Sequence, residues 1–425
     1  MAAGEGKADE RNRFRRMADG MTSRRKLLGV GLAGFGGLVA GRAAPGNFPP
    51  ESERTLGEPV LSPAYGRPSS HESLVQRRTW SNPPLEQASS LTPLGDLHGS
   101  ITPNGLFYER HHSGVPDIDP EAHRLVIHGA VRRPLVFTLD DLLRFPSVSR
   151  FHFLECTGNS GSELARPTRE TVQGTHGLLS CAEWTGVPLS TLLDEAGPLP
   201  EGLWLLAEGA DAGRMTRSVP IAKALDDAII AYAQNGEALR PEQGYPMRLF
   251  LPGWGGNLSV KWLRRLKVAA EPFYTREETS KYTDLMPDGS ARIFTWAMDA
   301  KSVITHPSGG QTMTGGPGWR QISGLAWSGR GRIAAVEIST DGGQRWRNAA
   351  LQEPVLDKCL TRFSLPWEWR GEPAVLQSRA VDETGYRQPT REQLIAVRGT
   401  HGAYHNNAIQ SWRVDPSGKV GNIHA

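Results

Sequence analysis

The sequence predicts an α+β protein in which a mixed α/β domain is followed by an immunoglobulin-like β-sandwich. Two patterns carry this prediction. Strand-like runs alternate with short helix-like runs between about residues 100 and 275, and from about residue 290 short strands separated by Gly and Pro follow at regular intervals. In addition, 48 glycines and 31 prolines in 425 residues favour turns and short elements over long helices. We find no internal repeat.

In the first domain, apolar periodicity predicts strands and helices of modest length. The expected strands are 123–129, 203–207 and 248–252, and the expected helices are 138–144, 188–196 and 221–226. In the second domain, the expected strands are 323–328, 333–339, 344–346, 360–365, 374–381 and 393–397, with a tight turn at 341–343. The chain is therefore divided into 1–44, 45–98 (extended), 99–284 (first domain), 285–400 (sandwich) and 401–425 (tail).

The N-terminal segment 1–44 resembles a bacterial twin-arginine export signal. Arg24-Arg25-Lys26 precedes a short, glycine-rich apolar run that is too short for a comfortable membrane span. This predicts a periplasmic protein exported in the folded state, with a basic tail or a retained anchor as alternatives. The segment holds nine Lys/Arg and four Asp/Glu, so its removal changes the net charge from +3 to −2. A nucleic-acid partner is not expected.

Cys156 is the most informative residue. It ends an apolar, aromatic-rich run and is followed by the turn-forming residues 157–159, as when a strand delivers one thiolate to a loop. Such a thiolate can be a nucleophile, a redox group or a soft metal ligand. The other two cysteines, Cys181 and Cys359, are expected to be buried and inert, although a disulfide between them is arithmetically possible.

Four segments in order together resemble the sulfite oxidase family of molybdenum-pterin enzymes over nearly the whole mature chain. They are 102–116, with Tyr-Glu-Arg-His-His; the loop at Cys156; 231–263, with Gly-Tyr-Pro-Met-Arg and Ser-Val-Lys-Trp-Leu; and the sandwich, with Ser-Thr-Asp-Gly-Gly, closing at Val397-Arg398-Gly399. The resemblance implies a molybdopterin-binding domain followed by a dimerisation domain.

The resemblance also implies site residues. Cys156 is the expected metal ligand, since soft sulfur ligation suits this metal. The residues expected to bind the molybdopterin cofactor are Tyr108, Arg110, His112, Asp211, Arg248, Ser259, Val260 and Lys261, with Arg248 and Lys261 suited to its phosphate. From the residues alone, Arg248 could be a surface charge at a strand end and Asp211 a turn former.

The catalytic residues implied by the resemblance are Cys156, Arg110, Tyr282 and Arg398. Arg110 and Arg398 would neutralise developing negative charge on a sulfur oxyanion, and Tyr282 would hold an oxygen and help to transfer its proton. The residues around Tyr282 match loosely, so an aromatic side chain on a solvent-facing loop is the alternative.

Two departures from the family pattern suggest a wide substrate mouth. Ser160 and Gly161 stand where sulfite-oxidising members carry arginine, and His176 stands nearest to the place of a pocket tryptophan. The sequence is thus similar to the sulfane dehydrogenases of the bacterial thiosulfate-oxidising system. These act on sulfane sulfur bound to a carrier protein and work with a c-type cytochrome. The chain lacks Cys-x-x-Cys-His, so no haem is expected on it, and a homodimer through the sandwich is expected.

Four alternatives remain open at this stage. A sulfite dehydrogenase would oxidise free sulfite, and a peptide reductase would run the same kind of site in reverse. A metal-free thiol hydrolase would use Cys156 with His152 or His176 as base. A non-catalytic periplasmic binding protein would use only the sandwich.

Overall fold

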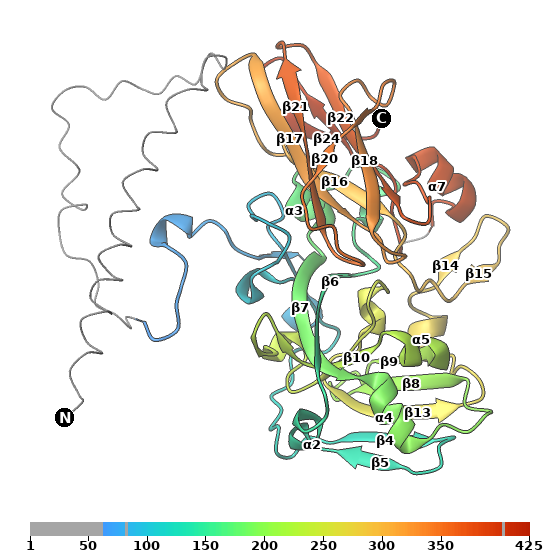
Figure 1. The fold of residues 1–425 in the computed structure, drawn as a ribbon. Coiled ribbons are helices and arrows are strands. Elements are labelled where there is room, and N and C mark those ends of the chain that lie inside the picture. Colours follow the sequence, from blue (N-terminus) through green and yellow to red (C-terminus); the bar gives the residue numbers. More distant parts are fainter. Residues whose placement is uncertain (1–62, 81–83, 402–403) are drawn as a thin grey trace, which may run out of the picture. The chain divides into compact units, whose positions relative to one another are not determined.

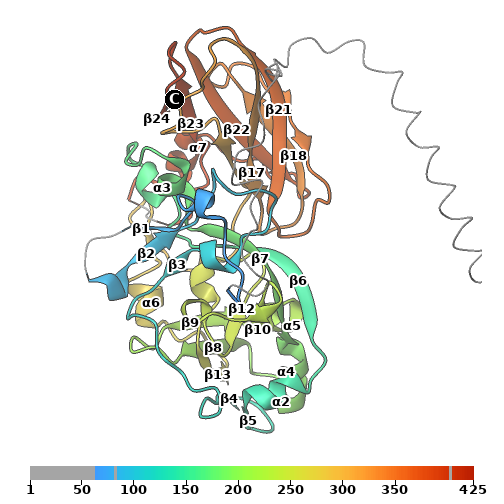
Figure 2. The same cartoon turned by 90° about the vertical axis from the view of Figure 1, so that its left-hand side faces the viewer.

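The computed structural model describes residues 63–80, 84–401 and 404–425. Ser69–Ala425 form one compact unit, which holds the helices and strands of the described residues (Figures 1 and 2). The predicted export signal 1–44 lies outside the described residues. Within the described ranges, no helix combines the length and the apolar character needed to span a lipid bilayer.

The first domain is built on three sheets with orders β1-β2-β3, β11-β10-β7-β6 (with β12 paired to β10) and β5-β4-β13-β8-β9. Only the pair β4–β13 is parallel among these strands of the described chain. The strands are β1 (Arg78–Trp80), β2 (Ser89–Leu91), β3 (Glu109–Arg110), β4 (Leu125–Gly129), β5 (Leu135–Phe137), β6 (Val148–Glu155), β7 (Leu179–Pro188), β8 (Trp204–Gly209), β9 (Thr216–Pro220), β10 (Ile229–Gln234), β11 (Glu237–Ala238), β12 (Arg248–Phe250) and β13 (Leu263–Ala269).

Short helices connect these strands. The α-helices are α2 (Leu139–Leu143), α3 (Val172–His176), α4 (Leu189–Ala196), α5 (Ile221–Asp226) and α6 (Arg276–Thr279), and the 3-10 helices are η4 (Ser70–Glu72), η5 (Leu85–Gln87), η6 (Asn104–Leu106), η7 (Gly161–Glu163), η8 (Pro241–Gln243) and η9 (Gly256–Leu258). α2 begins where the Thr138 hydroxyl and the Asp141 carboxylate cap each other's backbone N–H groups. α4 ends at Gly197, whose φ of 65° lies in the left-handed region.

The second domain is a sandwich of two antiparallel sheets with orders β16-β17-β21-β20 and β19-β18-β22-β23-β24, preceded by the hairpin β14–β15. Its elements are β14 (Asp284–Leu285), β15 (Ala291–Arg292), β16 (Lys301–His306), β17 (Gly318–Trp327), β18 (Ile333–Ser339), β19 (Arg347–Asn348), β20 (Ala350–Leu351), β21 (Thr361–Trp369), β22 (Ala374–Asp382), α7 (Arg391–Arg398), β23 (Ser411–Val414) and β24 (Val420–Ile423). Inward-facing Trp327, Phe363, Leu376 and Trp412 are buried between the sheets.

The predicted architecture, a mixed α/β domain followed by a β-sandwich, is confirmed. Two expectations for the C-terminal part were wrong. Residues 393–397 were expected as a strand but lie in α7, because Thr390 and Gln393 form a capping box that starts a helix. Residues 401–425 were expected as a tail, yet β23 pairs with β22, and β24 pairs with β23 at the edge of the second sheet.

The three cysteines are free, as the simpler sequence interpretation expected. Cys181 lies in β7 and Cys359 lies just before β21, and their sulfur atoms are 3.4 Å apart without a bond. Both side chains are buried. The segment before residue 98 is not merely an extended linker, because β1 and β2 form a sheet with β3 and Leu94 is fully buried.

Candidate active site

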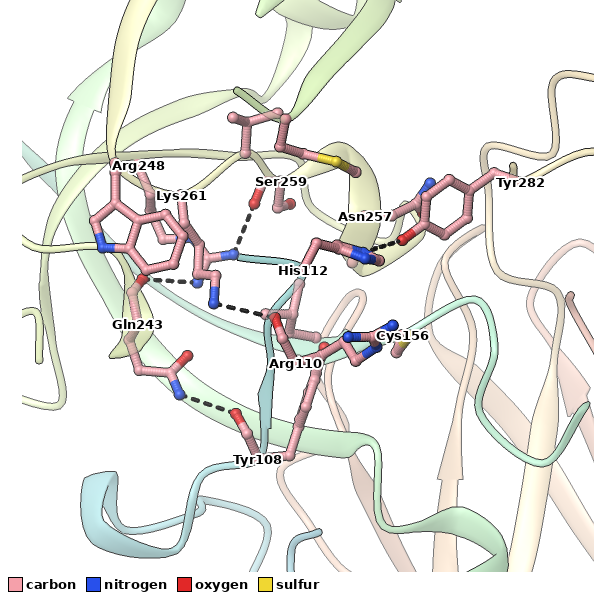
Figure 3. A pocket seen from close by; sticks show the side chains of 15 residues that line it. Tyr108, Arg110, His112, Cys156, Gln243, Arg248, Asn257, Ser259, Lys261 and Tyr282 are labelled. Carbon is pink, nitrogen blue, oxygen red and sulfur yellow. Dashed lines mark hydrogen bonds between the residues drawn. The ribbon is translucent and has the colours of Figure 1, made fainter. Parts of the chain in front are cut away.

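The cofactor cavity lies inside the first domain and has a volume of about 70 Å³ (Figure 3). Its lining comes from β3 and the residues after it, the end of β6, β12, the stretch after η9, and the loop after α6. The lining residues are Tyr108, Arg110, His112, Leu154, Cys156, Met215, Gln243, Arg248, Gly256, Asn257, Ser259, Val260, Lys261, Trp262 and Tyr282.

Cys156 is placed by the end of β6. Its backbone N–H donates to the Leu178 carbonyl at 3.0 Å, and its own carbonyl accepts from Asn159 N–H at 2.9 Å. Burial raises the pKa of the thiol, and this is only partly offset by the Gly158 N–H and the Arg110 charge. A thiol with a raised pKa is a weak nucleophile, whereas a bound metal ion deprotonates a coordinating thiol outright. The surroundings of Cys156 therefore favour a metal ligand over a free nucleophile.

Arg248, which is buried, and Lys261, which is only partly buried, form a pair of cations at one end of the cavity. Arg248 donates to the carbonyls of Gln243 at 3.0 Å and Ser259 at 2.8 Å, and its Nε has no partner in the described chain. Lys261 Nζ contacts the carbonyls of Arg110 at 3.2 Å and Glu242 at 3.0 Å, and Nδ1 of His111 at 2.9 Å. Burial lowers the pKa of Arg248 to about 10 and, together with the Arg248 charge, that of Lys261 to about 7.

Neither of these two cations forms a salt bridge with a carboxylate of the described residues. Charge buried in this way is costly unless it is compensated. A phosphate group would supply the missing negative charge and accept hydrogen bonds from both side chains. The residues present thus fit the phosphate of a molybdopterin cofactor, with Cys156 available to the metal at the other end.

Tyr282 and His112 meet at the metal end of the cavity. The Tyr282 hydroxyl lies 2.8 Å from Nε2 of His112 (Figure 3). The Arg217 guanidinium stacks 5.1 Å from the centre of the Tyr282 ring. Burial raises the pKa of Tyr282, with Cys156 adding to the effect. Desolvation by the surrounding protein and the nearby charge of Arg110 lower the pKa of His112 to about 4. Both groups are therefore uncharged near neutral pH, and the pair can hold or pass a single proton.

A wider funnel opens onto the same end of the cavity, with a volume of about 820 Å³. Four residues line both spaces: Arg110, His112, Cys156 and Tyr282. The rest of the funnel is lined by Gln87, Ser89, Gly158, Gly161, Ser162, Ala165, Leu178, Arg276, Lys281, Thr400, His401 and Tyr404. These described lining residues include the cations of Arg110, Arg276 and Lys281 but no carboxylate, so the funnel favours anionic groups.

The cavity brings together nine of the eleven residues that the sequence suggested, namely Tyr108, Arg110, His112, Cys156, Arg248, Ser259, Val260, Lys261 and Tyr282. The other two lie outside the cavity and the funnel. Asp211 is buried and accepts from the Met215 N–H at 3.0 Å, so it stabilises a turn. Arg398, at the end of α7, forms an ion pair with buried Asp284 at 3.2 Å. Its charge is thereby neutralised within the protein.

Residues invoked to explain a wide mouth are also placed differently from the sequence interpretation. Gly161 lines the funnel, but Ser160 and His176 are buried and do not. His176 instead lines a separate small cavity with Glu163. His152 stacks on Phe250 and lines neither the cavity nor the funnel, which argues against a Cys156–His152 hydrolase.

The sequence interpretation missed several polar residues around the cavity. Gln243 donates to the Tyr108 carbonyl at 2.9 Å, and Asn257 accepts from the Thr157 hydroxyl at 3.3 Å. Neither belongs to a periodic pattern, so no local signal marked them. Lys301 opens a strand that also contains Ser302, Thr305 and His306, so its sequence does not mark this lysine as buried either.

Comparison with known proteins agrees with this geometry. Residues 112–276 match the family model of the oxidoreductase molybdopterin binding domain, and residues 292–412 match that of the Mo-co oxidoreductase dimerisation domain. The mitochondrial sulfite oxidase of Mus musculus is 31% identical over 76% of this chain and 61% of its own length. That of Homo sapiens is 33% identical over 64% of this chain and 52% of its own length. The chain thus spans between half and two thirds of these curated relatives.

A solved structure shows a much fuller match. The crystal structure of the sulfane dehydrogenase SoxCD from Paracoccus pantotrophus contains a chain that is 51% identical, with a TM-score of 0.86. The match covers 87% of this chain and 96% of that one. The predicted molybdopterin cofactor is confirmed by these matches. Fold, cavity and relatives agree: the chain belongs to the sulfite oxidase family of molybdopterin-dependent oxidoreductases.

Proposed function

We propose that this protein oxidises sulfane sulfur held on a carrier protein, with oxygen taken from water and electrons passed to a c-type cytochrome. One observation carries the proposal: Cys156 and Arg110 lie where the cofactor cavity opens into a wide funnel whose described lining residues include no carboxylate. A group held on another protein needs such an opening, and an anionic sulfur group is matched by its charge. The 51% identity to a sulfane dehydrogenase supports the same substrate class.

The molybdenum cofactor supplies two-electron oxygen transfer when it is bound. In each cycle, a sulfane sulfur loses two electrons and gains one oxygen, and the water that provides this oxygen releases two protons. The two electrons leave for the cytochrome one at a time. The protein's own contribution is to bind the sulfur group, orient it and move the protons.

Arg110 is the cation that we assign to the sulfur oxyanion. Its guanidinium donates to the carbonyls of Gln87, at 2.9 Å, and His111, and it forms no ion pair with a described carboxylate. Its full charge is therefore available to the substrate. Arg398 receives no such role, because Asp284 already neutralises it. Tyr282 and His112 are placed to hold an oxygen and to pass its proton outward.

Oxidation of free sulfite is the second candidate, and the identity to curated sulfite oxidases favours it. The deciding experiment uses purified, molybdenum-loaded protein with oxidised cytochrome c. It compares three substrates: carrier-bound sulfane sulfur, the same sulfur compound without carrier, and free sulfite. We expect cytochrome reduction to require the carrier. Rapid turnover of micromolar free sulfite in the absence of carrier would contradict the proposal.

The partners and location follow from the same proposal. We propose a periplasmic homodimer, joined through the C-terminal domain and served by a separate cytochrome. The match to a dimerisation domain and the Arg24-Arg25 pair support these assignments. Light scattering tests the dimer. Cell fractionation of a variant with both arginines changed to lysine tests export, which we expect to be blocked.

A further inference from the structure

The loop that carries Cys156 is held on one side by the C-terminal domain. His405 N–H donates to the Thr157 carbonyl at 2.6 Å. The Asn406 side chain donates to the Ser160 carbonyl at 2.8 Å, and the Ser160 hydroxyl donates to the Asn406 carbonyl at 3.1 Å. Three hydrogen bonds therefore tie residues 157–160 to the segment between α7 and β23.

Lys301, the first residue of β16, makes the central contact. Its ammonium group donates to Glu155 at 2.9 Å and to the Ser160 hydroxyl at 2.8 Å, which are the residues just before and four positions after Cys156. Both members of the ion pair are buried: Glu155 is 0% exposed and Lys301 is 1% exposed. One side chain of the sandwich thus spans the whole turn that presents the thiol.

Every acceptor of the Glu155 carboxylate is used. Oε1 accepts from Lys301 and, at 2.9 Å, from the Asn159 side chain, while Oε2 accepts from the Trp327 indole at 2.7 Å. Two of these three donors belong to the sandwich. A buried charged network is stabilising only when it is satisfied in this way, and it then fixes one conformation.

The backbone of the loop needs such support. Ser160 has a φ of 58°, in the left-handed region that a residue with a side chain rarely adopts. A conformation of this kind persists when its surroundings determine it, and such conformations cluster at functional sites. Lys301 and Asn406 both bind the Ser160 side chain, so the sandwich provides the determining contacts.

We infer that the C-terminal domain is part of the metal site, and that Lys301 is the positioning residue that sets the direction of the Cys156 sulfur. This role goes beyond dimerisation, and it holds for whichever sulfur compound the protein oxidises. It acts through the geometry of the loop, since Lys301 lines neither the cofactor cavity nor the funnel.

The test compares Lys301→Met with Lys419→Met, an exposed lysine of the same domain, in the full-length protein. Three quantities are measured: molybdenum per chain after dialysis, the thiolate-to-molybdenum absorption of the loaded fraction, and molecular mass. For Lys301→Met we expect about 10-fold weaker metal retention, as for other residues that orient metal ligands. We also expect a shifted absorption band and an unchanged mass. Lys419→Met should match the wild type in all three.

If Lys301→Met does not yield folded protein, the double variant Glu155→Gln/Lys301→Met removes both charges together and replaces it. A shifted band and weaker metal retention in either folded variant support the positioning role. Wild-type metal content with an unshifted band overturns it, even if thermal stability falls, because the pair would then serve only the stability of the core.

Discussion

Two groups of cations in the described chain, Arg248 with Lys261 and Lys301 by itself, differ in whether the chain supplies a carboxylate partner. Arg248 and Lys261 bond only to neutral groups and have no described carboxylate partner, whereas Lys301 is paired with Glu155 and every acceptor of that carboxylate is satisfied. The first set is incomplete without an anion supplied from outside, which marks a binding site. The second set is complete within the chain, which marks a structural support. Burial of charge alone would not distinguish the two; the presence of a partner does.

Replacing the Cys156 sulfur should have the largest effect on activity. Cys156→Ser keeps the size of the side chain but removes the soft ligand, so we expect activity to fall about 1,000-fold, or about 4 kcal/mol in the activation barrier. Steady-state kinetics and elemental analysis check this together. Cys181→Ser is the matched control, because Cys181 lies outside the cavity, and it should retain its molybdenum. Full activity and metal content in Cys156→Ser would refute the assignment of the ligand.

The satisfied pair should be sensitive to loss of one partner. Glu155→Gln leaves the Lys301 ammonium buried without its carboxylate, which typically costs about 3–5 kcal/mol of folding free energy. Urea unfolding of the metal-free protein measures it. Glu337→Gln, in a partly exposed ion pair with Arg379, should cost about 1 kcal/mol or less. If both variants lose the same unfolding free energy, the buried Glu155–Lys301 pair stabilises the fold no more than a partly exposed pair.

Replacing Lys261, which has no described carboxylate partner, should not lower the stability of the cofactor-free protein, because Lys261→Met removes a partly buried charge. Cofactor retention should fall about 10- to 100-fold, because the phosphate loses a donor. Thermal unfolding and cofactor content after dialysis report the two effects separately. A less stable cofactor-free variant would show that Lys261 is a structural residue.

The lowered pKa of Lys261 predicts that the stability of the cofactor-free protein depends on pH. The folded pKa of Lys261 is about 7, far below its ordinary value near 10.5, so between these values the unfolded chain binds more protons than the folded chain. The contribution of Lys261 to the stability of the cofactor-free protein should therefore increase as pH rises from about 7 to about 10. This contribution is the unfolding free energy of the wild type minus that of Lys261→Met, measured at each pH. If this difference in unfolding free energy does not change with pH, the pKa of Lys261 is not lowered.

The funnel cations should have the smallest effect. Lys281→Gln and Arg276→Gln remove exposed charges at the mouth, so we expect KM to rise about 2- to 5-fold with little change in kcat, and the effect to shrink at high salt. Arg370→Gln, on the sandwich surface away from the funnel lining, is the control. A large loss of kcat in the funnel variants would place these residues in the chemistry itself.

The sequence was sufficient for the architecture and for most of the cavity, because those residues stand in continuous motifs. Cys156 directly follows β6 and Arg248 begins β12, and these two residues and Ser259–Lys261 were assigned to the site because their motifs resemble those of the sulfite oxidase family. Arg398 shows the limit: it also stands in a motif, but its partner Asp284 is 114 positions away, and only the fold reveals that its charge is taken. The helical state of 391–398 was missed because a capping box outweighed a short strand-like run.

The Glu155–Lys301 network was beyond sequence reasoning for the same reason. Its members are 146 positions apart, and nothing in the local pattern of either strand indicates a cross-domain ion pair. Distant pairings of this kind depend on how the two domains pack, whereas motif recognition works on neighbours in the chain. The residues that touch the cofactor were therefore easier to find than those that hold the loop in place.

The shared carboxylate has a consequence for dissecting or recombining this protein. A fragment that ends before β16 would keep every described residue of the cofactor cavity, yet it would lose Lys301 and Trp327, which donate hydrogen bonds to Glu155 beside Cys156. The border between the domains along the chain is thus not a place where the gene can be cut or shuffled freely. A chimaera that takes its catalytic half from one relative should inherit the matching lysine and tryptophan from the same parent.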